Sequence, residues 1–358
     1  PDAKKLKTVI VEETVATLAR PQHGILGIGN PLLDISDNVT PQLLEKYGLD
    51  SNNAILAEEK HLPLYKELAA QPSCQYIAGG ATQNSIRVAQ WMMQQYCATA
   101  YMGCVGDDDY AQKMRAAVKG DGVEAIYMVD KTAQTGTCAV CITGNDRSLV
   151  ANLGAANNFK LTHLRDNETT AKTAKVIYSA GFFITVSPET IEVVSTSATR
   201  ALYCMNLSAP FLMQVPPFKA CFVKTMPYVD FLFGNEAEAI TWAETEGWDT
   251  KDVSFIATRL SLIPMANAGK HRHIVITQGT DPTIVAHRGK VKTYPIVPIQ
   301  KEKIVDTNGA GDAYVGGFLA GLEKGMDIQK CHDAGAYAAS VIIQRSGCTL
   351  SGKPDFKW

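Results

Sequence analysis

Short apolar runs, most of them ending in glycine, asparagine or serine, recur along the chain and are mostly followed by residues with helical periodicity. Six such runs are predicted to be strands, at residues 24–30, 99–106, 175–183, 201–208, 229–235 and 273–279. Repeated strand-to-helix units are typical of a mostly parallel sheet covered by helices. We therefore expect an α/β fold with a doubly wound sheet, and such sheets carry their functional groups at the carboxyl ends of the strands.

Two stretches depart from this alternation, because they contain strand and turn signals without an intervening helix. They lie within residues 31–58 and 135–157, and the second is predicted to be a hairpin about Gly144, Asn145 and Asp146. A small sheet inserted into a doubly wound domain is well placed to form a lid, although an irregular edge hairpin has the same periodicity. We expect a small β lid from these two stretches, and one large α/β domain from residues 1–30, 59–134 and 158–358.

Length and composition exclude several classes of protein. The 358 residues suffice for two average domains or for one large α/β domain with an insertion. A charged fraction of 20% with a net charge of -2 argues against nucleic acid as the main partner. No apolar run approaches the roughly 18 residues of a membrane span, and residues 1–24 lack the apolar core of a signal peptide. We expect a soluble, cytoplasmic protein, with a nuclear location left open.

The nine cysteines are odd in number and scattered, which favours reduced thiols over a disulfide framework. Cys138 and Cys141 have the spacing of a metal or redox motif, but they lie in a predicted strand. An odd separation in a strand puts two side chains on opposite faces. Neither a second cysteine pair nor a paired histidine follows, so both thiols are expected to pack in the interior.

The stretch IVDTNGAGDAYVGGFLAGL, residues 304–322, combines an apolar pair, a glycine-rich loop and a helical pattern. Backbone N–H groups of such a loop and of the first helical turn favour bound anions. Asp312 follows Gly309, Ala310 and Gly311 directly, and its charge would oppose an anion unless it performs chemistry beside one. A helix cap is the other role open to Asp312. Asp306 precedes the glycines and is expected to order the turn.

Polar residues follow two early strands. The GIGNPL segment lacks the third glycine of a dinucleotide-binding motif, but it places Asn30 and Asp34 just past a strand. Asp34 could accept hydrogen bonds from two vicinal hydroxyls or form an Asx turn. Gly80 and Asn84 open the next helix, where the backbone can approach a ligand; a plain helix N-terminus explains the same residues.

Two further candidates concern phosphate chemistry. Asn235 and Glu238 follow a strand at a spacing that puts them on one helix face. They could organise hydrated Mg²⁺, or Glu238 could simply favour the helix dipole. Arg147 lies in the predicted lid hairpin and is either an exposed charge or, after lid closure, a phosphate contact.

The combination and order of several motifs resemble the ribokinase (PfkB) family of carbohydrate and nucleoside kinases. The motifs are GNPLLDI, AGGATQNS, TGTCAVCITG, DRSL, AGFFITVSPE, NLSAPF, FGNEAEA and DTNGAGDAYVGGF. The resemblance implies a ribokinase-like α/β domain that binds nucleotide, with a small β lid over the substrate. It also implies transfer of the γ-phosphate of ATP to a sugar hydroxyl with Mg²⁺, and the nucleoside-specific motifs point to the 5′-hydroxyl of adenosine, in purine salvage.

The resemblance assigns roles to individual residues. Asp312 would be the catalytic base, Gly309, Ala310 and Gly311 the anion hole, and Arg147 a contact to the transferred phosphate. The substrate contacts would be Asn30, Asp34, Gly80, Asn84, Cys138, Leu149, Ala151, Leu153, Phe211 and Phe183 or its neighbour Phe182. Asn235, Thr277, Gly279 and Asn308 would border ATP, and Asn235 with Glu238 would hold Mg²⁺ through water. A monomer is expected, because the lid closes without a partner subunit.

Ala54 and Ala81 depart from the family pattern, which has glutamine and serine there. Loss of an amide beside the purine would loosen discrimination among purine analogues. Three alternatives stay open: a sibling sugar or nucleoside kinase, a binding protein or pseudokinase that keeps the fold, and an intramembrane aspartyl protease that uses a GxGD motif. The intact Asp312 argues against the second, and the missing membrane span argues against the third.

Overall fold

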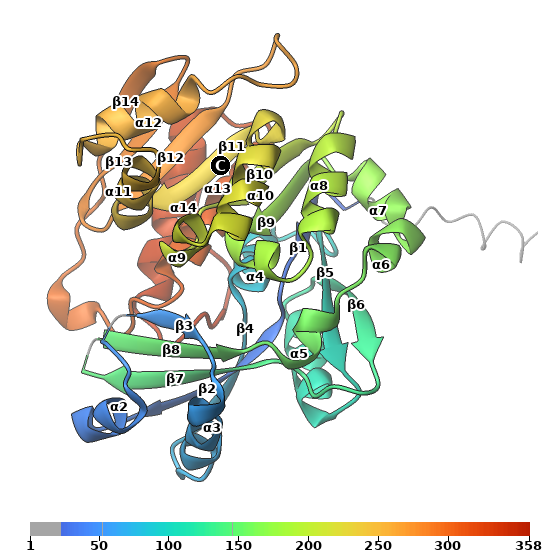
Figure 1. Cartoon of the computed structure of the whole chain (residues 1–358), viewed down its shortest axis with the longest axis vertical. Helices are drawn as coiled ribbons and strands as arrows, with labels where there is room; N and C mark the ends of the chain where they lie inside the picture. Colours follow the sequence, from blue (N-terminus) through green and yellow to red (C-terminus); the bar gives the residue numbers. More distant parts are fainter. Residues whose placement is uncertain (1–22, 52, 145) are drawn as a thin grey trace, which may run out of the picture.

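The computed structural model describes residues 23–51, 53–144 and 146–358. Residues 1–22 of the predicted large domain and Asn145 of the predicted hairpin turn lie outside them. The described residues form two sheets, the larger with helices on both faces and the smaller at the lower left of Figure 1. In that part of the chain, no helix combines the length and apolarity needed to cross a membrane.

The larger sheet is mostly parallel, which confirms the predicted fold class. Its order is β14 (Lys290–Tyr294), β13 (Asp281–His287), β12 (His273–Gln278), β11 (Phe231–Asn235), β10 (Leu202–Asn206), β9 (Val176–Ala180), β1 (Ile25–Ile28), β5 (Thr99–Gly106) and β6 (Glu124–Asp130). Each of the six predicted runs contains one of these strands. The run 175–183 is shorter as a strand than expected, because residues Gly181–Thr185 form a 3₁₀ turn. The parallel edge strand β6 and the antiparallel strands β13 and β14 were not predicted.

Two hydrophobic clusters pack on opposite faces of this sheet. Successive residues of β1, Ile25 and Leu26, belong to different clusters, as the alternation of a strand requires. The first cluster is covered by α4 (Ala81–Met93), α5 (Asp109–Gly120), α13 (Ala310–Glu323) and α14 (Ile328–Ile342). The second is covered by α6 (Leu161–Asp166), α8 (Pro188–Ser197), α9 (Phe211–Gln214), α10 (Pro216–Thr225), α11 (Glu236–Thr245) and α12 (Val253–Ser261), with α7 (Glu168–Thr173) at its margin.

The smaller sheet contains the strands expected from the two helix-poor stretches and one more. Its order is β3 (Ala54–Leu56), β8 (Asp146–Asn152), β7 (Thr137–Thr143), β2 (Leu32–Asn38) and β4 (Gln75–Gly79). β4 had been assigned to the large domain, but it pairs antiparallel with β2. The first of the two stretches also contains a helix, α2 (Pro41–Tyr47), against the expectation of none, and α2 covers the outer face together with α3 (Leu62–Ala69). The domain boundaries themselves stay a prediction.

Cys138 and Cys141 lie in β7 on opposite faces of the smaller sheet, as predicted. Cys141 packs in the cluster under α2 and α3, whereas Cys138 packs on the inner face with Leu32 and Leu153. Both thiols are buried, and burial raises the pKa of each. These pKa values agree with packing thiols rather than with reactive ones.

Close packing of α4 against α13 brings together two polar residues of the predicted site. A Cβ atom added at Gly316 of α13 would lie 2.5 Å from the carbonyl oxygen of Ser85 in α4 and 2.8 Å from Cβ of Val88. The absence of a side chain at Gly316 therefore lets the two helix backbones approach one another. Asn84 and Asp312, near the N-terminal ends of the two helices, come within hydrogen-bonding distance as a result.

Gly316→Ala should force these helices apart. We expect the free energy of unfolding to fall by about 1–3 kcal/mol, the usual cost of overpacking, with a loss of turnover because Asn84 and Asp312 separate. Gly120→Ala at the end of α5 is the control, since its added Cβ meets nothing within 4 Å. Denaturant unfolding of both variants checks the prediction, which would be wrong if the two substitutions had equal effects.

Candidate functional site

A cavity of about 430 Å³ lies between the inner face of the smaller sheet and the carboxyl ends of the larger sheet. Most of the predicted site residues line it: Asn30, Asp34, Gly80, Asn84, Cys138, Leu149, Ala151, Leu153, Phe183, Phe211, Asn235, Glu238, Thr277, Asn308, Gly309, Gly311 and Asp312. Arg147, Ala310 and Gly279 are not among its lining residues. The structure thus brings most of the predicted residues to one cavity, and their roles stay a prediction.

Asp312 occupies the third position of α13, and its carboxylate is held from α4. Asn84 Nδ2 donates to Asp312 Oδ2 at 3.0 Å. The N-cap of α13 is Gly309, with φ of 76° and no side-chain cap, so the helix-cap role does not apply to Asp312. Burial raises the pKa of Asp312 to about 7, although the hydrogen bond from Asn84 lowers it. The group therefore titrates near neutrality, as a proton acceptor should.

Asp34 lies on the inner face of the smaller sheet, next to Cys138 of β7. A Cβ added at Gly79 would lie 2.3 Å from Asp34 Oδ1, so the missing side chain makes room for the carboxylate. Burial, and then the charge of Asp312, raise the pKa of Asp34 to about 7. Two carboxylates thus face one cavity and oppose each other's ionisation.

Gly80 is required by the packing of the chain as well as by any ligand. Its φ is 92°, which favours glycine, and an added Cβ would lie 2.3 Å from the carbonyl oxygen of Asn30. Thr82, the second residue of α4, accepts a hydrogen bond from the amide of Ala180 at 3.0 Å. The exits of β1, β4 and β9 are therefore joined at this point.

Two asparagines present unsatisfied oxygen atoms near the cavity. Oδ1 of Asn30 and Oδ1 of Asn84 are buried and have no hydrogen-bond partner among the described residues. The amide nitrogens of both side chains are engaged, at 3.3 Å with the carbonyl oxygen of Phe182 for Asn30 and with Asp312 for Asn84. Buried acceptors without a donor are costly, so the site is suited to a ligand that carries hydroxyl or amino groups.

Asp306 orders the loop before α13, as expected. The residue is 2% exposed, and its two side-chain oxygens accept hydrogen bonds from the amides of Asn308 and Gly347, each at 2.8 Å. In the predicted anion hole, Gly309 and Gly311 line the cavity. Ala310 instead donates its amide to the carbonyl oxygen of Thr307 at 3.3 Å.

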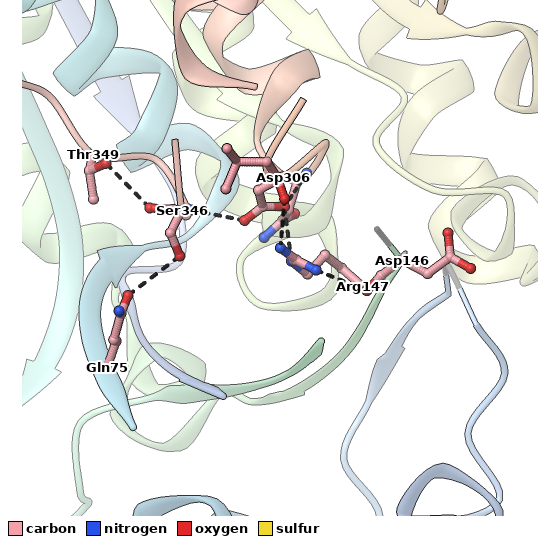
Figure 2. Close-up of polar contacts among 9 residues, drawn as sticks. Gln75, Asp146, Arg147, Asp306, Ser346 and Thr349 are labelled. Atoms are coloured by element: carbon pink, nitrogen blue, oxygen red, sulfur yellow. Dashed lines mark hydrogen bonds and ion pairs between the residues drawn. The ribbon is translucent and has the colours of Figure 1, made fainter. Parts of the chain in front are cut away.

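Arg147 is buried and points to this loop rather than forming part of the cavity wall. Its Nε lies 2.9 Å from Asp306 Oδ1, as Figure 2 shows. The expected phosphate contact is thus not the arrangement seen here, and the alternative of an exposed charge is wrong, because Arg147 is 7% exposed.

Asn235 and Glu238 form a reciprocal cap at the start of α11. Asn235 Oδ1 accepts from the amide of Glu238 at 2.9 Å, while the Glu238 carboxylate accepts from the amide and Nδ2 of Asn235, both at 3.0 Å. Burial raises the pKa of Glu238 to about 7. No group of three or more His, Cys, Asp or Glu side chains that could hold a metal ion occurs in the described chain. One carboxylate of this kind fits an ion that keeps most of its waters.

One part of the cavity wall is apolar. Ala54 and Leu149 are cross-strand neighbours of β3 and β8, as are Leu56 and Ala151. The rings of Phe182 and Phe211 have centroids 6.3 Å apart, whereas Phe183 packs edge-on against Phe159 in the core. Of the two phenylalanines left open by the sequence, both line the cavity, and Phe182 is the less buried.

Sequence reasoning missed Asn206 and Ser208, which line the cavity at the end of β10. Asn206 Oδ1 accepts from the amide of Ser208 at 2.9 Å, and Ser208 has φ of 68°, an uncommon value outside glycine. Their signal was present, since a strand that ends in asparagine and serine resembles the other exits, but no role had been assigned to it.

Comparisons with known proteins agree with this geometry. The model of the pfkB family carbohydrate kinases matches residues 41–355. Adenosine kinase 2 of Arabidopsis thaliana is 53% identical over 336 residues, which cover 93% of this chain and 97% of that protein. Adenosine kinase of Dictyostelium discoideum is 42% identical over 91% of this chain and 96% of its own length.

A solved structure has the same architecture. The crystal structure of Anopheles gambiae adenosine kinase in complex with P1,P4-di(adenosine-5) tetraphosphate has a TM-score of 0.89 and 46% identity, covering 93% of this chain and 99% of that one. The family match and these identities lead to one conclusion. The chain belongs to the pfkB family of carbohydrate kinases.

Proposed function

We propose that this chain is an ATP:adenosine 5′-phosphotransferase, which transfers the γ-phosphate of ATP to the 5′-hydroxyl of adenosine and forms AMP and ADP. The observation that carries the proposal is the position of Asp312, a half-buried carboxylate beside a glycine-rich helix N-terminus, on the wall of a cavity with polar and apolar parts. The 53% identity with a protein named adenosine kinase supports the choice of substrate.

Asp312 accepts the proton of the 5′-hydroxyl as that oxygen attacks phosphorus. A ribose hydroxyl is a very weak acid, so a positioned base is needed. Asn84 fixes the carboxylate from the side of α4. The amides of Gly309 and Gly311 and the dipole of α13 stabilise negative charge on the transferred group. Base and anion site are adjacent because one serves the nucleophile and the other the electrophile.

The nucleoside lies with its ribose toward the polar wall and its base toward the apolar wall. Asp34 accepts hydrogen bonds from the two hydroxyls of the ribose diol, and the unsatisfied oxygens of Asn30 and Asn84 accept from other donor groups of the bound substrates. Leu149, Ala151 and the phenylalanines enclose the base. Ala54 and Ala81 both line the cavity and leave room beside the base, which relaxes the choice among purine analogues.

ATP is the co-substrate, and Asn235, Thr277, Gly279 and Asn308 border its site in this proposal. Mg²⁺ would be held through water by Asn235 and Glu238, and it would neutralise phosphate charge there. We further propose a cytoplasmic monomer that works in purine salvage, without a nucleic-acid or membrane partner.

An assay of phosphate transfer from ATP to adenosine, inosine and ribose tests the function directly. We expect adenosine to be the best acceptor and ribose the poorest, because ribose leaves the apolar part of the cavity empty. Equal use of ribose would point to a sibling sugar kinase. Transfer to none of the three would point to a binding protein.

Asp312→Asn should abolish most of the turnover of a folded protein. Loss of a general base typically lowers the rate about 10²- to 10⁴-fold. The pKa of the folded group, about 7, is above its ordinary value of 3.8, so its contribution to stability is present at low pH and is lost as pH rises through 7. The Asn variant should therefore melt at a higher temperature than the parent at pH 8.

The pH profile is the second measurement for Asp312. In the parent, kcat/KM should fall as pH drops below 7, because the base becomes protonated, and this acid limb should be absent from the residual activity of Asp312→Asn. Turnover within a few-fold of the parent would rule out the assignment of Asp312 as the base.

Asp34→Ala should lower kcat/KM for adenosine about 10- to 100-fold, because a charge-assisted contact to the diol contributes about 1.5–3 kcal/mol. The preference for adenosine over 2′-deoxyadenosine should shrink in the same variant. Asp37→Ala is a matched control, since Asp37 is buried in the same strand but bonds to Ser73, away from the cavity. Asp34 lies within β2 and not in the Asx turn considered from the sequence, so normal use of adenosine by Asp34→Ala would mean that Asp34 does not contact the diol.

A further inference from the structure

The smaller sheet reaches the phosphate-binding loop through one buried guanidinium. Arg147 stands at the start of β8, and its side chain extends to the loop before α13 (Figure 2). Nε lies 2.9 Å from Asp306 Oδ1, and Nη2 donates to the carbonyl oxygen of Val305 at 3.3 Å. Nη1 donates to the carbonyl oxygen of Asp146 at 3.1 Å, within its own strand. Nη1 and Nη2 thus make hydrogen bonds, and Nε makes an ion-pair contact; Nε and Nη2 reach from the smaller sheet to the loop before α13.

Asp306 connects Arg147 to the backbone of the loop. The oxygen that pairs with Arg147 also accepts the amide of Asn308 at 2.8 Å. Asn308 directly precedes Gly309, where the chain takes a φ of 76° and enters α13. The carboxylate that receives the guanidinium is therefore the one that sets the approach of the chain to the anion hole.

A second route joins the same carboxylate to the other edge of the smaller sheet. Asp306 Oδ2 accepts the amide of Gly347, and the neighbouring Ser346 Oγ lies 3.4 Å from Gln75 Oε1 in β4 (Figure 2). A Cβ at Gly347 would lie 2.8 Å from Ile77 Cδ1, so this turn packs closely on β4. Asp306 is thus contacted from β8 directly and from β4 through the 346–347 turn.

We propose that Arg147 and Asp306 are a pair of positioning residues that couple the placement of the smaller sheet to the shape of the anion hole. When the sheet is seated, the guanidinium neutralises Asp306 and fixes its oxygen on the amide of Asn308. When the sheet lifts, Asp306 is left as a buried charge without this partner, and the loop loses order because an unpaired buried charge is costly. The catalytic consequence rests on the proposed function: phosphate is held productively only with the sheet in place.

In this proposal Arg147 acts through Asp306 and not by touching phosphate. It is absent from the cavity wall, and its side chain is 6% exposed against 3% for Asp306. A contact to phosphate would require the guanidinium to leave a carboxylate that holds it in the interior. Direct contact of Arg147 with phosphate and action of Arg147 through Asp306 make opposite predictions for a double variant. Residues that act through each other do not have independent effects.

The first test measures hydrogen exchange of the backbone amides at 307–312 without any substrate. Arg147→Gln should make the amide of Asn308 and its neighbours exchange at least about tenfold faster, although residue 147 is remote in sequence. Asp121→Asn is the matched control, since Asp121 pairs with the buried Arg87 at 2.6 Å and makes no contact with the loop in the described structure. Unchanged exchange in Arg147→Gln, or equal acceleration in Asp121→Asn, would overturn the proposal.

The second test is a double-mutant cycle in kcat/KM for ATP. Arg147→Gln and Asp306→Asn should each lower it by about 10- to 100-fold, and the double variant should be no worse than the poorer single one. Multiplying losses would show that Arg147 works independently of Asp306 and would overturn the proposal. If the parent failed to phosphorylate adenosine, the proposed function would fall, while the exchange measurement would still decide whether the sheet orders the loop.

Discussion

The hydrogen bond from Asn84 to Asp312 is the contact on which the rest of the site depends. It joins the first turns of α4 and α13, and it exists because Gly316 lets the two helices pack backbone against side chain. Both this bond and the dipole of α13 favour the charged carboxylate. Burial acts in the opposite direction and is the larger effect, since the pKa of Asp312 is raised to about 7. At neutral pH the carboxylate of Asp312 is therefore ionised in only part of the molecules.

Much of the fold could be predicted from the sequence, because the central parallel strands are buried on both faces and read as apolar runs with clear ends. β5 matches its predicted run in full, and β11 and β12 match nearly so. The edge strands β6 and β14 were missed, since neither is buried on both faces and neither has a continuous buried apolar run, and β13 was missed with β14. The pairing of β4 with β2 was not predicted for a related reason: a strand that carries Gln75 and Tyr76 on an open edge gives no signal of which sheet it joins.

Most of the predicted site residues line one cavity, but several of their partners in the structure were not predicted. Motif order predicted which residues line the cavity, because strand exits in a parallel sheet meet at one edge. It could not show that Asn84 would bond to Asp312, or that Arg147 would pair with Asp306, since such contacts depend on side-chain directions across elements far apart in sequence. Arg147 lies in a hairpin and Asp306 in a loop that follows β14, and nothing local to either residue indicates the other.

The position of β1 has a consequence for how the chain is made. β1 lies in the interior of the larger sheet, between β5 and β9. During synthesis from the N-terminus, β1 can pair with β5 early, but its other edge stays open until Val176 has been added. Between these two events the chain must also complete the smaller sheet, because β7 and β8 lie between β5 and β9 in the sequence. An apolar strand with an open edge is prone to pair with other chains. During this interval the nascent protein reaches its native strand order only if aggregation is slower than synthesis, or if chaperones protect the open edge.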